Sequence, residues 1–287
     1  MKTFKMILGQ ALALMALAAP VFAASNPPHR YLALGDSVSF GYNPTVVPNL
    51  QNYIGYPEIL DPLVPKQEVN ASCPGQTSAS FLSGTDTSEV QGAGCEGKYG
   101  WKANYPLHVA YSVSQADFAV SQLKSSKSID LVTLGIGGND LLRVQQDCLS
   151  ATSFAACVAA ALVGTQTKPG ALTAYAANLT EILRRIRIDA HYNGTLVLVK
   201  YFATSTDPVV IGAIAALNQV MTLVGSQFGA KMADGFTAFQ IASLPYGYDP
   251  CKAGLLIRLS PTTCDVHPTR LGQTVLASTV VIAIFGK

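Results

Sequence analysis

The chain has 287 residues, of which 13% are charged, and its 19 lysines and arginines against 17 acidic residues give a formal net charge of +2. This charged fraction is well below the roughly 25% of ordinary globular domains, and the absence of a basic excess excludes a protein that binds nucleic acid through a positive field. The length suffices for one large domain with a substantial core.

Residues 1–23 have the pattern of a secretory leader, with Lys2 and Lys5 before an apolar run and small residues at Val21 and Ala23. A membrane anchor is the alternative, but the apolar run is shorter than the roughly 20 residues that a bilayer core requires. Cleavage would leave 17 basic and 17 acidic residues, because the leader holds two lysines and no acid. We therefore expect a secreted protein, extracellular or periplasmic, without stable membrane insertion.

Short apolar runs alternate with helical patterns along the mature chain. The run at 30–34 predicts a first strand, and 43–106 is rich in Pro, Gly, Asn and Ser, which predicts long loops with short helices that shape a pocket. Ser114 and Asp117 have the spacing of a capping box. Further on we predict helices and strands as follows: helices 114–123, 171–188, 209–228 and 269–284, and strands 129–136, 195–202 and 231–236.

This alternation predicts an α/β fold in which helices cover both faces of a parallel sheet. Continuous apolar strands such as 129–136 (IDLVTLGI) are typical of strands that are buried on both faces. No linker or internal repeat divides the chain, so we predict a single domain over residues 24–287.

Six cysteines in an exported chain predict disulfides, although the sequence allows about fifteen pairings. Pairing in neighbour order, which closes only local loops, is favoured: Cys73–Cys95, Cys148–Cys157 and Cys251–Cys264. Zinc binding is the weaker alternative, because no two cysteines are two to four residues apart and no histidine pair has the spacing of ligands. We expect no metal and no cofactor.

A polar pair, Asp36-Ser37, follows the first predicted strand in the stretch LGDSVSFGY. Chemistry in open α/β sheets gathers at the carboxyl ends of strands, so Ser37 is a candidate nucleophile. A serine at this place is also a common helix cap, and the residues of this stretch alone do not decide between the two roles.

Four blocks together resemble the GDSL family of esterases and lipases, also called SGNH hydrolases. LGDSVSFGY (34–42) is similar to the serine block, NASCPGQT (70–77) to the glycine block, GIGGND (135–140) to the asparagine block and DVHPT (265–269) to the histidine block. They occur in the family order and span nearly the whole mature chain.

The resemblance implies a three-layer α/β/α sandwich with a flavodoxin-like parallel sheet. It implies that Ser37 is the nucleophile, that His267 is the general base, and that the backbone N–H groups of Ser37 and Gly75 and the side-chain amide of Asn139 form the oxyanion hole. These roles agree with the chemistry of ester hydrolysis, because a serine hydroxyl needs a base to take its proton and fixed donors stabilise the tetrahedral oxyanion. A residue without Cβ, such as Gly75, also lets the backbone approach a substrate closely.

One position departs from the family pattern. The family usually places its histidine-orienting aspartate three residues before the histidine, where this chain has Cys264, whereas Asp265 stands two residues before. In an extended segment residues two apart point to the same side, so Asp265 is our candidate for the third catalytic residue. The backbone carbonyl of Cys264 is the alternative partner of His267.

The sequence thus predicts a secreted serine esterase or lipase that acts on a small-molecule or lipid ester and is a monomer. A carbohydrate acetyl esterase of the same fold and an inactive secreted binding protein are the alternatives. The G-x-S-x-G motif of α/β-hydrolases and the phosphate-binding G-x-x-x-x-G-K-[ST] are both absent from the sequence. Among the histidines, His267 is preferred over His29, His108 and His191 as the base, because it precedes the last predicted helix as the family base does.

Overall fold

The computed structural model describes residues 30–60, 64, 67–86, 94–126 and 128–286, so the predicted leader lies outside the described residues. Five parallel strands form the central sheet in the order β2-β1-β3-β4-β5. This is the strand order of flavodoxin-like doubly wound sheets, and the predicted fold class is confirmed. The strands are β1 (Arg30–Gly35), β2 (Gln67–Asn70), β3 (Ile129–Gly135), β4 (Thr195–Val199) and β5 (Lys231–Ala233).

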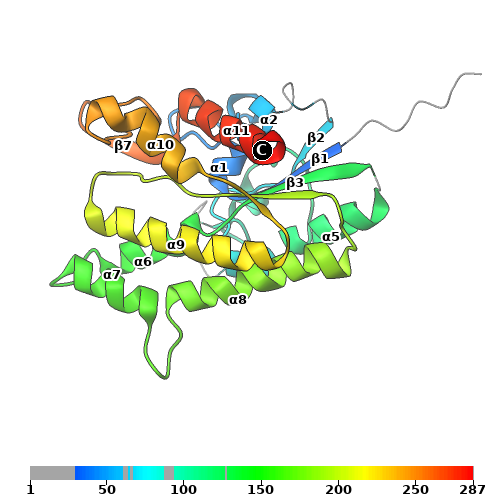
Figure 1. Cartoon of the computed structure of the whole chain (residues 1–287), viewed down its shortest axis with the longest axis horizontal. Helices are drawn as coiled ribbons and strands as arrows, with labels where there is room; N and C mark the ends of the chain where they lie inside the picture. The colour runs from blue at the N-terminus through cyan, green and yellow to red at the C-terminus, as the bar shows by residue number, and fades with distance from the viewer. Residues whose placement is uncertain (1–29, 61–63, 65–66, 87–93, 127, 287) are drawn as a thin grey trace, which may run out of the picture.

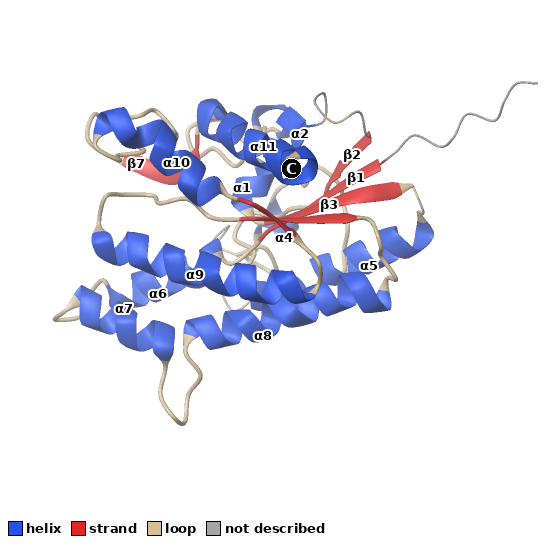
Figure 2. Cartoon of the chain, in the orientation of Figure 1, coloured by secondary structure: helices blue, strands red, loops and turns tan. Residues whose placement is uncertain are grey.

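Helices cover both faces of this sheet, as the ribbon views show (Figure 1, Figure 2). Side chains of the larger layer form one core cluster with one face of the sheet, and those of the smaller layer form a second cluster with the opposite face. The larger layer contains α3 (Ser78–Ser83), α5 (Gln115–Ser125), α6 (Gly138–Cys148), α7 (Phe154–Val163), α8 (Ala171–Arg184), η2 (Arg185–Asp189) and α9 (Pro208–Gln227). The smaller layer contains α2 (Tyr56–Leu60), α10 (Gly235–Ser243) and α11 (Arg270–Phe285).

Strand side chains alternate between the two cores, which explains why the inner strands β1, β3 and β4 are mainly apolar. In β3, Val132 and Leu134 pack in the larger layer's cluster, whereas Leu131 packs in the smaller layer's cluster. The polar residue Thr133 of β3 is fully buried, and its hydroxyl is 2.6 Å from the hydroxyl of Tyr31 on β1. The sequence pattern of a doubly covered sheet is therefore borne out in its packing.

Helix α9 is, among the described residues, the one helix long and apolar enough to cross a membrane by length and composition. In the structure it lies beside α8 (Figure 1), and its side chains Ala213, Ile214, Leu217 and Met221 are buried in the larger core cluster. Interior packing of this kind accounts for its apolar composition.

Most predicted elements are present, with differences at their ends. The predicted strand 231–236 is wrong beyond Ala233, because Asp234 accepts a hydrogen bond from the N–H of Thr237 and starts α10 there. The loop-rich region 43–106 contains short helices as predicted, among them η1 (Leu50–Asn52) and α4 (Trp101–Asn104), but also the edge strand β2, which the sequence analysis missed. Helices α6, α7 and α10 were likewise missed.

Beyond the sheet, a short antiparallel pair of β6 (Leu256–Arg258) and β7 (Cys264–Pro268) precedes α11. The structure joins the six cysteines in neighbour order, as Cys73–Cys95, Cys148–Cys157 and Cys251–Cys264. The last of these bonds ties β7 to the turn before β6. It thereby anchors the strand that carries His267.

Candidate active site

Ser37 lies where β1 ends and the single-turn helix α1 (Ser37–Phe40) begins. Asp36 caps this helix, and its Oδ1 accepts a hydrogen bond from the N–H of Val38 at 3.0 Å. The N–H of Ser37, as the first residue of the helix, has no acceptor within the helix. The serine therefore presents both its hydroxyl and a backbone donor at the carboxyl edge of the sheet.

His267 on β7 reaches Ser37 across 230 residues of sequence, with its Nε2 2.8 Å from the serine Oγ. Its Nδ1 contacts Oδ1 of Asp265, and its backbone N–H donates to the same oxygen at 3.0 Å. Both side chains lie on one side of the extended strand. The structure thus brings a serine, a histidine and a carboxylate into one hydrogen-bonded chain.

The partner of His267 Nδ1 in the structure is Asp265 and not the carbonyl of Cys264. Burial raises the pKa of Asp265, but its contacts with His267, the charge of a protonated imidazole and backbone N–H groups outweigh burial and leave the pKa below its ordinary value. A carboxylate held ionised in this place would fix the tautomer and favour the charged imidazolium.

Asn139, in the asparagine block, is the second residue of α6, and its Nδ2 donates to the carbonyl oxygen of Gln76 at 2.9 Å. The same Nδ2 is 3.5 Å from Oδ2 of Asp36, which is a long and therefore weak hydrogen bond. The next residue, Asp140, accepts hydrogen bonds from the N–H and hydroxyl of Ser78 at 2.9 and 2.6 Å. The asparagine block is thereby joined to the glycine block at Gln76 and to the residue that follows that block, Ser78.

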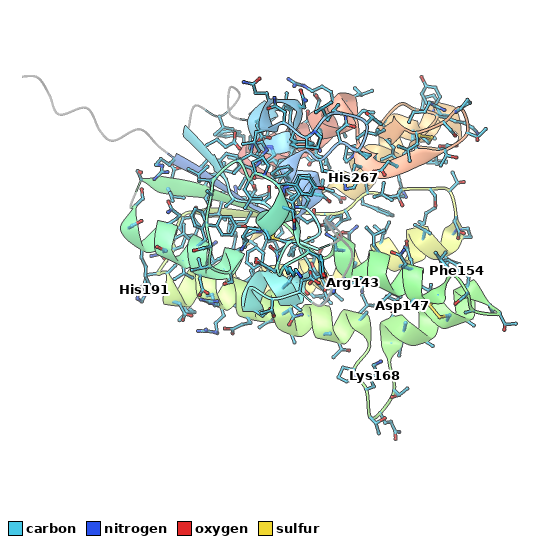
Figure 3. All side chains as sticks on the ribbon, turned by 180° about the vertical axis from the view of Figure 1, so that it is seen from behind. Arg143, Asp147, Phe154, Lys168, His191 and His267 are labelled. Atoms are coloured by element: carbon cyan, nitrogen blue, oxygen red, sulfur yellow. A yellow bond between two sulfur atoms is a disulfide. The ribbon has the colours of Figure 1, made fainter. Side chains whose placement is uncertain are left out.

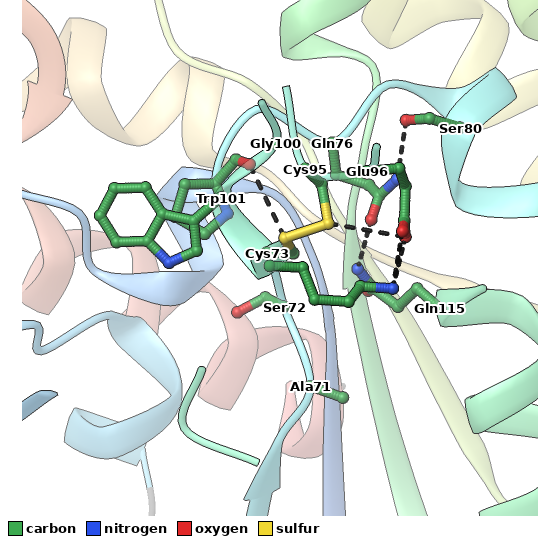
Figure 4. The surroundings of a disulfide bond; sticks show 12 residues. Ala71, Ser72, Cys73, Gln76, Ser80, Cys95, Glu96, Gly100, Trp101 and Gln115 are labelled. Atoms are coloured by element: carbon green, nitrogen blue, oxygen red, sulfur yellow. Dashed lines mark hydrogen bonds and ion pairs between the residues drawn. A yellow bond between two sulfur atoms is a disulfide. The ribbon is translucent and has the colours of Figure 1, made fainter. Parts of the chain in front are cut away.

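Gly75 adopts a φ of +76°, in the left-handed region that favours glycine. Its loop is held by the bond between Asn139 and Gln76 and by the disulfide Cys73–Cys95, two residues away. Figure 4 shows this disulfide beside Trp101 and Gln115. Gly75 is not among the residues that line the pocket next to Ser37, although Ser37, Asn139 and His267 are.

A pocket that is partly open to solvent adjoins Ser37 and His267. Its walls are mostly apolar and come from α6, α9 and the segment after β4, including Leu141, Leu142, Phe202, Ile214 and Leu217. The region 43–106 was expected to shape a pocket, but none of its residues that the structure describes lines this one. Its aromatic side chains instead pack on one another in a separate cluster around Tyr53 and Trp101.

Three residues at the site were not predicted from the sequence. Tyr201 donates its hydroxyl to Oδ2 of the buried Asp36, and Tyr42 packs edge-on against the His267 ring with centroids 4.8 Å apart. Gln115 is fully buried; it accepts from the N–H of Gly35 at 2.6 Å and donates to the Gly35 carbonyl at 3.0 Å. Tyr201 had a usable signal, since it stands where a predicted strand ends. Gln115 had none.

The other histidines occupy different places. His108 contacts the carbonyl of Phe40 through Nε2 at 3.0 Å, and His191 is exposed and, in Figure 3, well separated from His267. His29 lies outside the described residues. Across the part of the chain that the structure describes, no group of three or more His, Cys, Asp or Glu side chains could hold a metal ion.

A sequence profile of the GDSL-like lipase/acylhydrolase family matches residues 33–275. No curated protein matches the chain. Among solved structures, phospholipase A1 from Streptomyces albidoflavus is similar with a TM-score of 0.57 and 17% identity, over 90% of this chain and 100% of that chain. An extracellular lipase from Streptomyces rimosus has a TM-score of 0.57 and 18% identity, over 89% and 100%. An acetylxylan esterase from Geobacillus stearothermophilus has a TM-score of 0.56 and 16% identity, over 90% and 95%.

Proposed function

Since the chain belongs to the GDSL-like lipase/acylhydrolase family, we propose that it is a secreted serine esterase that hydrolyses carboxylic esters through an acyl-enzyme on Ser37. The observation that carries the proposal is the 2.8 Å contact between the Ser37 Oγ and the His267 Nε2. A hydroxyl within hydrogen-bond reach of an imidazole is the arrangement that makes serine a nucleophile at neutral pH.

In the first half-reaction the Ser37 Oγ attacks the ester carbonyl carbon while His267 Nε2 takes the hydroxyl proton. Asp265 keeps Nδ1 protonated, so that Nε2 is free to act as the base, and stabilises the imidazolium that forms. The tetrahedral intermediate collapses when the imidazolium gives its proton to the leaving alcohol. The acyl group remains on Ser37.

The oxyanion of that intermediate needs donors that are already in place. The N–H groups of Ser37 and Gly75 and the amide of Asn139 are the proposed donors, and one such donor is worth roughly 3–4 kcal/mol of transition-state stabilisation. The hydrogen bond from Asn139 to Gln76 fixes one amide hydrogen. The other faces Asp36 at 3.5 Å and is only weakly engaged, so a developing oxyanion can compete for it.

In the second half-reaction His267 activates a water molecule that attacks the acyl-enzyme, and the imidazolium returns the proton to Ser37 as the acid leaves. Every proton is carried by His267. The proposed chemistry requires no metal and no organic cofactor.

The apolar pocket beside Ser37 supports an acyl chain longer than acetyl as the preferred substrate. A methylene group buried from water contributes about 0.8 kcal/mol, so walls such as Leu142 and Ile214 would favour medium chains over acetyl by roughly fourfold for each added carbon that they bury. We propose that the enzyme is a monomer and that its substrate is a simple or lipid ester rather than an acetylated carbohydrate. The even balance of charge in residues 24–287 supports a neutral substrate and no nucleic-acid partner.

The direct test is hydrolysis of p-nitrophenyl esters from acetyl to palmitoyl by the protein lacking residues 1–23, beside Ser37→Ala. We expect turnover that Ser37→Ala lowers by about 10⁵-fold or more, with a maximum at medium chain length. Ser126→Ala is a matched control, because Ser126 is the residue after α5 and lies away from the site. A folded wild-type protein without turnover on any ester would refute the proposal, and a preference for acetyl would favour the carbohydrate acetyl esterase.

A further inference from the structure

A buried tyrosine and a buried aspartate form a pair behind the nucleophile that the mechanism above leaves unexplained. Asp36 is 1% exposed and Tyr201 is 9% exposed, and the Tyr201 hydroxyl donates to Oδ2 of Asp36. Tyr201 belongs to the segment that follows β4, 165 residues away from Asp36 along the chain. Both side chains line the pocket next to Ser37.

The backbone of Tyr201 is fixed from the other side by a second buried polar residue. Asn218 on α9 accepts from the N–H of Tyr201 at 2.9 Å and donates to the Tyr201 carbonyl at 2.7 Å. Asn218 is itself 5% exposed. This two-point bond sets the direction in which the tyrosine ring leaves the chain.

The ring of Tyr201 then lies against the start of α6. A Cβ built on Gly138 would come within 2.6 Å of the ring, so the bare backbone of this glycine makes room for it. The ring therefore lies directly against the residue that precedes Asn139, while its hydroxyl reaches Asp36.

The two oxygens of Asp36 serve different parts of the proposed oxyanion hole. Oδ1 accepts from the N–H of Val38 and so orients the first turn of α1, which begins at Ser37. Oδ2 accepts from Tyr201 and faces the Asn139 amide at 3.5 Å. Rotation of this carboxylate would disturb the nucleophile's helix and the amide together.

We propose that Tyr201 is a positioning residue: its hydroxyl holds the Asp36 carboxylate in the one orientation that aligns the Ser37 N–H and the Asn139 amide on the same oxyanion. The inference rests on the proposed function. It assigns Tyr201 no contact with the reacting atoms, only an effect that passes through Asp36.

Ionisation of Asp36 gives this role a signature in pH. Burial raises the pKa of Asp36 to about 6, while the hydrogen bonds from Tyr201 and from the Val38 N–H lower it. Loss of the Tyr201 hydroxyl should therefore raise the pKa of Asp36 further, so that the carboxylate forms only at higher pH. The titratable groups that face Asp36, besides Tyr201, are His267 on β7, Asp140 on α6, Tyr56 on α2 and Tyr175 on α8.

The experiment compares Tyr201→Phe with Tyr192→Phe. Tyr192 is a buried tyrosine whose hydroxyl donates to the carbonyl of Thr195 at 2.9 Å, at the start of β4 and away from the site. We expect Tyr201→Phe to lower kcat about 10-fold to 100-fold and to leave KM within twofold. The variant loses a hydrogen bond to the charged Asp36, and the donors that this bond aligns stabilise the transition state and not the bound substrate. The acidic limb of its kcat profile should move to higher pH, and Tyr192→Phe should leave both unchanged.

A double variant tests whether Tyr201 acts through Asp36. In an Asp36→Ala background, Tyr201→Phe should change kcat by less than about twofold, since the partner is already gone. Urea unfolding of all variants separates activity loss from instability. Three outcomes would overturn the inference. They are a Tyr201→Phe enzyme with the kcat and the acidic pH limb of the wild type, a loss of kcat no larger than that of Tyr192→Phe, and losses of kcat that add in the double variant. A wild type without ester turnover would instead overturn the proposed function, and this inference with it.

Discussion

Replacement of Asp265 by asparagine tests the departure from the family pattern at the catalytic histidine. Asp265 contacts His267 Nδ1, and their side chains are 22% and 13% exposed. Two unit charges about 4 Å apart near a protein surface interact by about 4 kcal/mol at an effective dielectric constant of 20. Loss of this stabilisation from the imidazolium transition state corresponds to a fall of roughly 10³-fold in kcat/KM.

The assay is steady-state hydrolysis of p-nitrophenyl butyrate by Asp265→Asn, beside Asp249→Asn. Asp249 also has a side chain that is 22% exposed, and it accepts hydrogen bonds from the N–H groups of Cys251 and Lys252. It lies next to the disulfide Cys251–Cys264, which anchors the strand that carries His267. We expect kcat/KM of the control within twofold of wild type. A loss below tenfold in Asp265→Asn, with His267→Ala inactive, would refute the triad and assign the orienting role to the Cys264 carbonyl.

Three further predictions follow from burial and packing. Removal of the disulfide by Cys73→Ser with Cys95→Ser should lower the free energy of unfolding by about 3 kcal/mol, from a loop of 22 residues, and lower kcat; urea unfolding and ester assays check both. Leu142→Trp should fill the pocket and lower the octanoyl-to-acetyl ratio of kcat/KM at least tenfold, whereas Leu223→Trp, on an exposed face of α9, should not. Because the folded pKa of Asp36, about 6, lies above the ordinary 3.8, the folded state binds more protons than the unfolded state between these values, so this group lowers stability as pH rises through that window. The free energy of unfolding should fall by about 3 kcal/mol through this window. The measurement is the difference in unfolding free energy between wild type and Asp36→Asn from pH 4 to 7. A difference that does not change with pH would contradict the prediction.

The sheet could be predicted from the sequence because its strands are buried on both faces. Runs such as Ile129–Gly135 and Thr195–Val199 consist mainly of apolar residues, because their side chains pack in the two cores. The edge strand β2 escaped prediction, since its four residues QEVN include three polar ones and lie among loops. Its place in the sheet comes from pairing with β1, which local sequence does not encode.

The residues of the candidate site divide in the same way. Ser37, Asn139 and His267 lie in short motifs at strand ends or before a helix, and the structure brings their side chains to one pocket. Gln115 and Asn218 hold the site through long-range bonds to Gly35 and Tyr201, and neither belongs to one of the four blocks that resemble the family. A polar residue within a helical pattern is predicted to be exposed to solvent, and only the folded structure shows that it is buried.

Asp36 shows why such supporting groups matter to the chemistry. A carboxylate beside an oxyanion hole opposes the developing negative charge, yet with a pKa of about 6 roughly nine in ten Asp36 side chains are ionised at pH 7. The donors from Tyr201 and Val38 disperse that charge, and the 3.5 Å separation leaves the Asn139 amide free to turn to a better acceptor. The same charge faces His267 and favours its protonated form. The carboxylate thus helps the imidazolium and hinders the oxyanion, and the buried hydroxyl of Tyr201 weakens the hindrance because its hydrogen bond partly offsets the negative charge on Oδ2, the oxygen that faces Asn139.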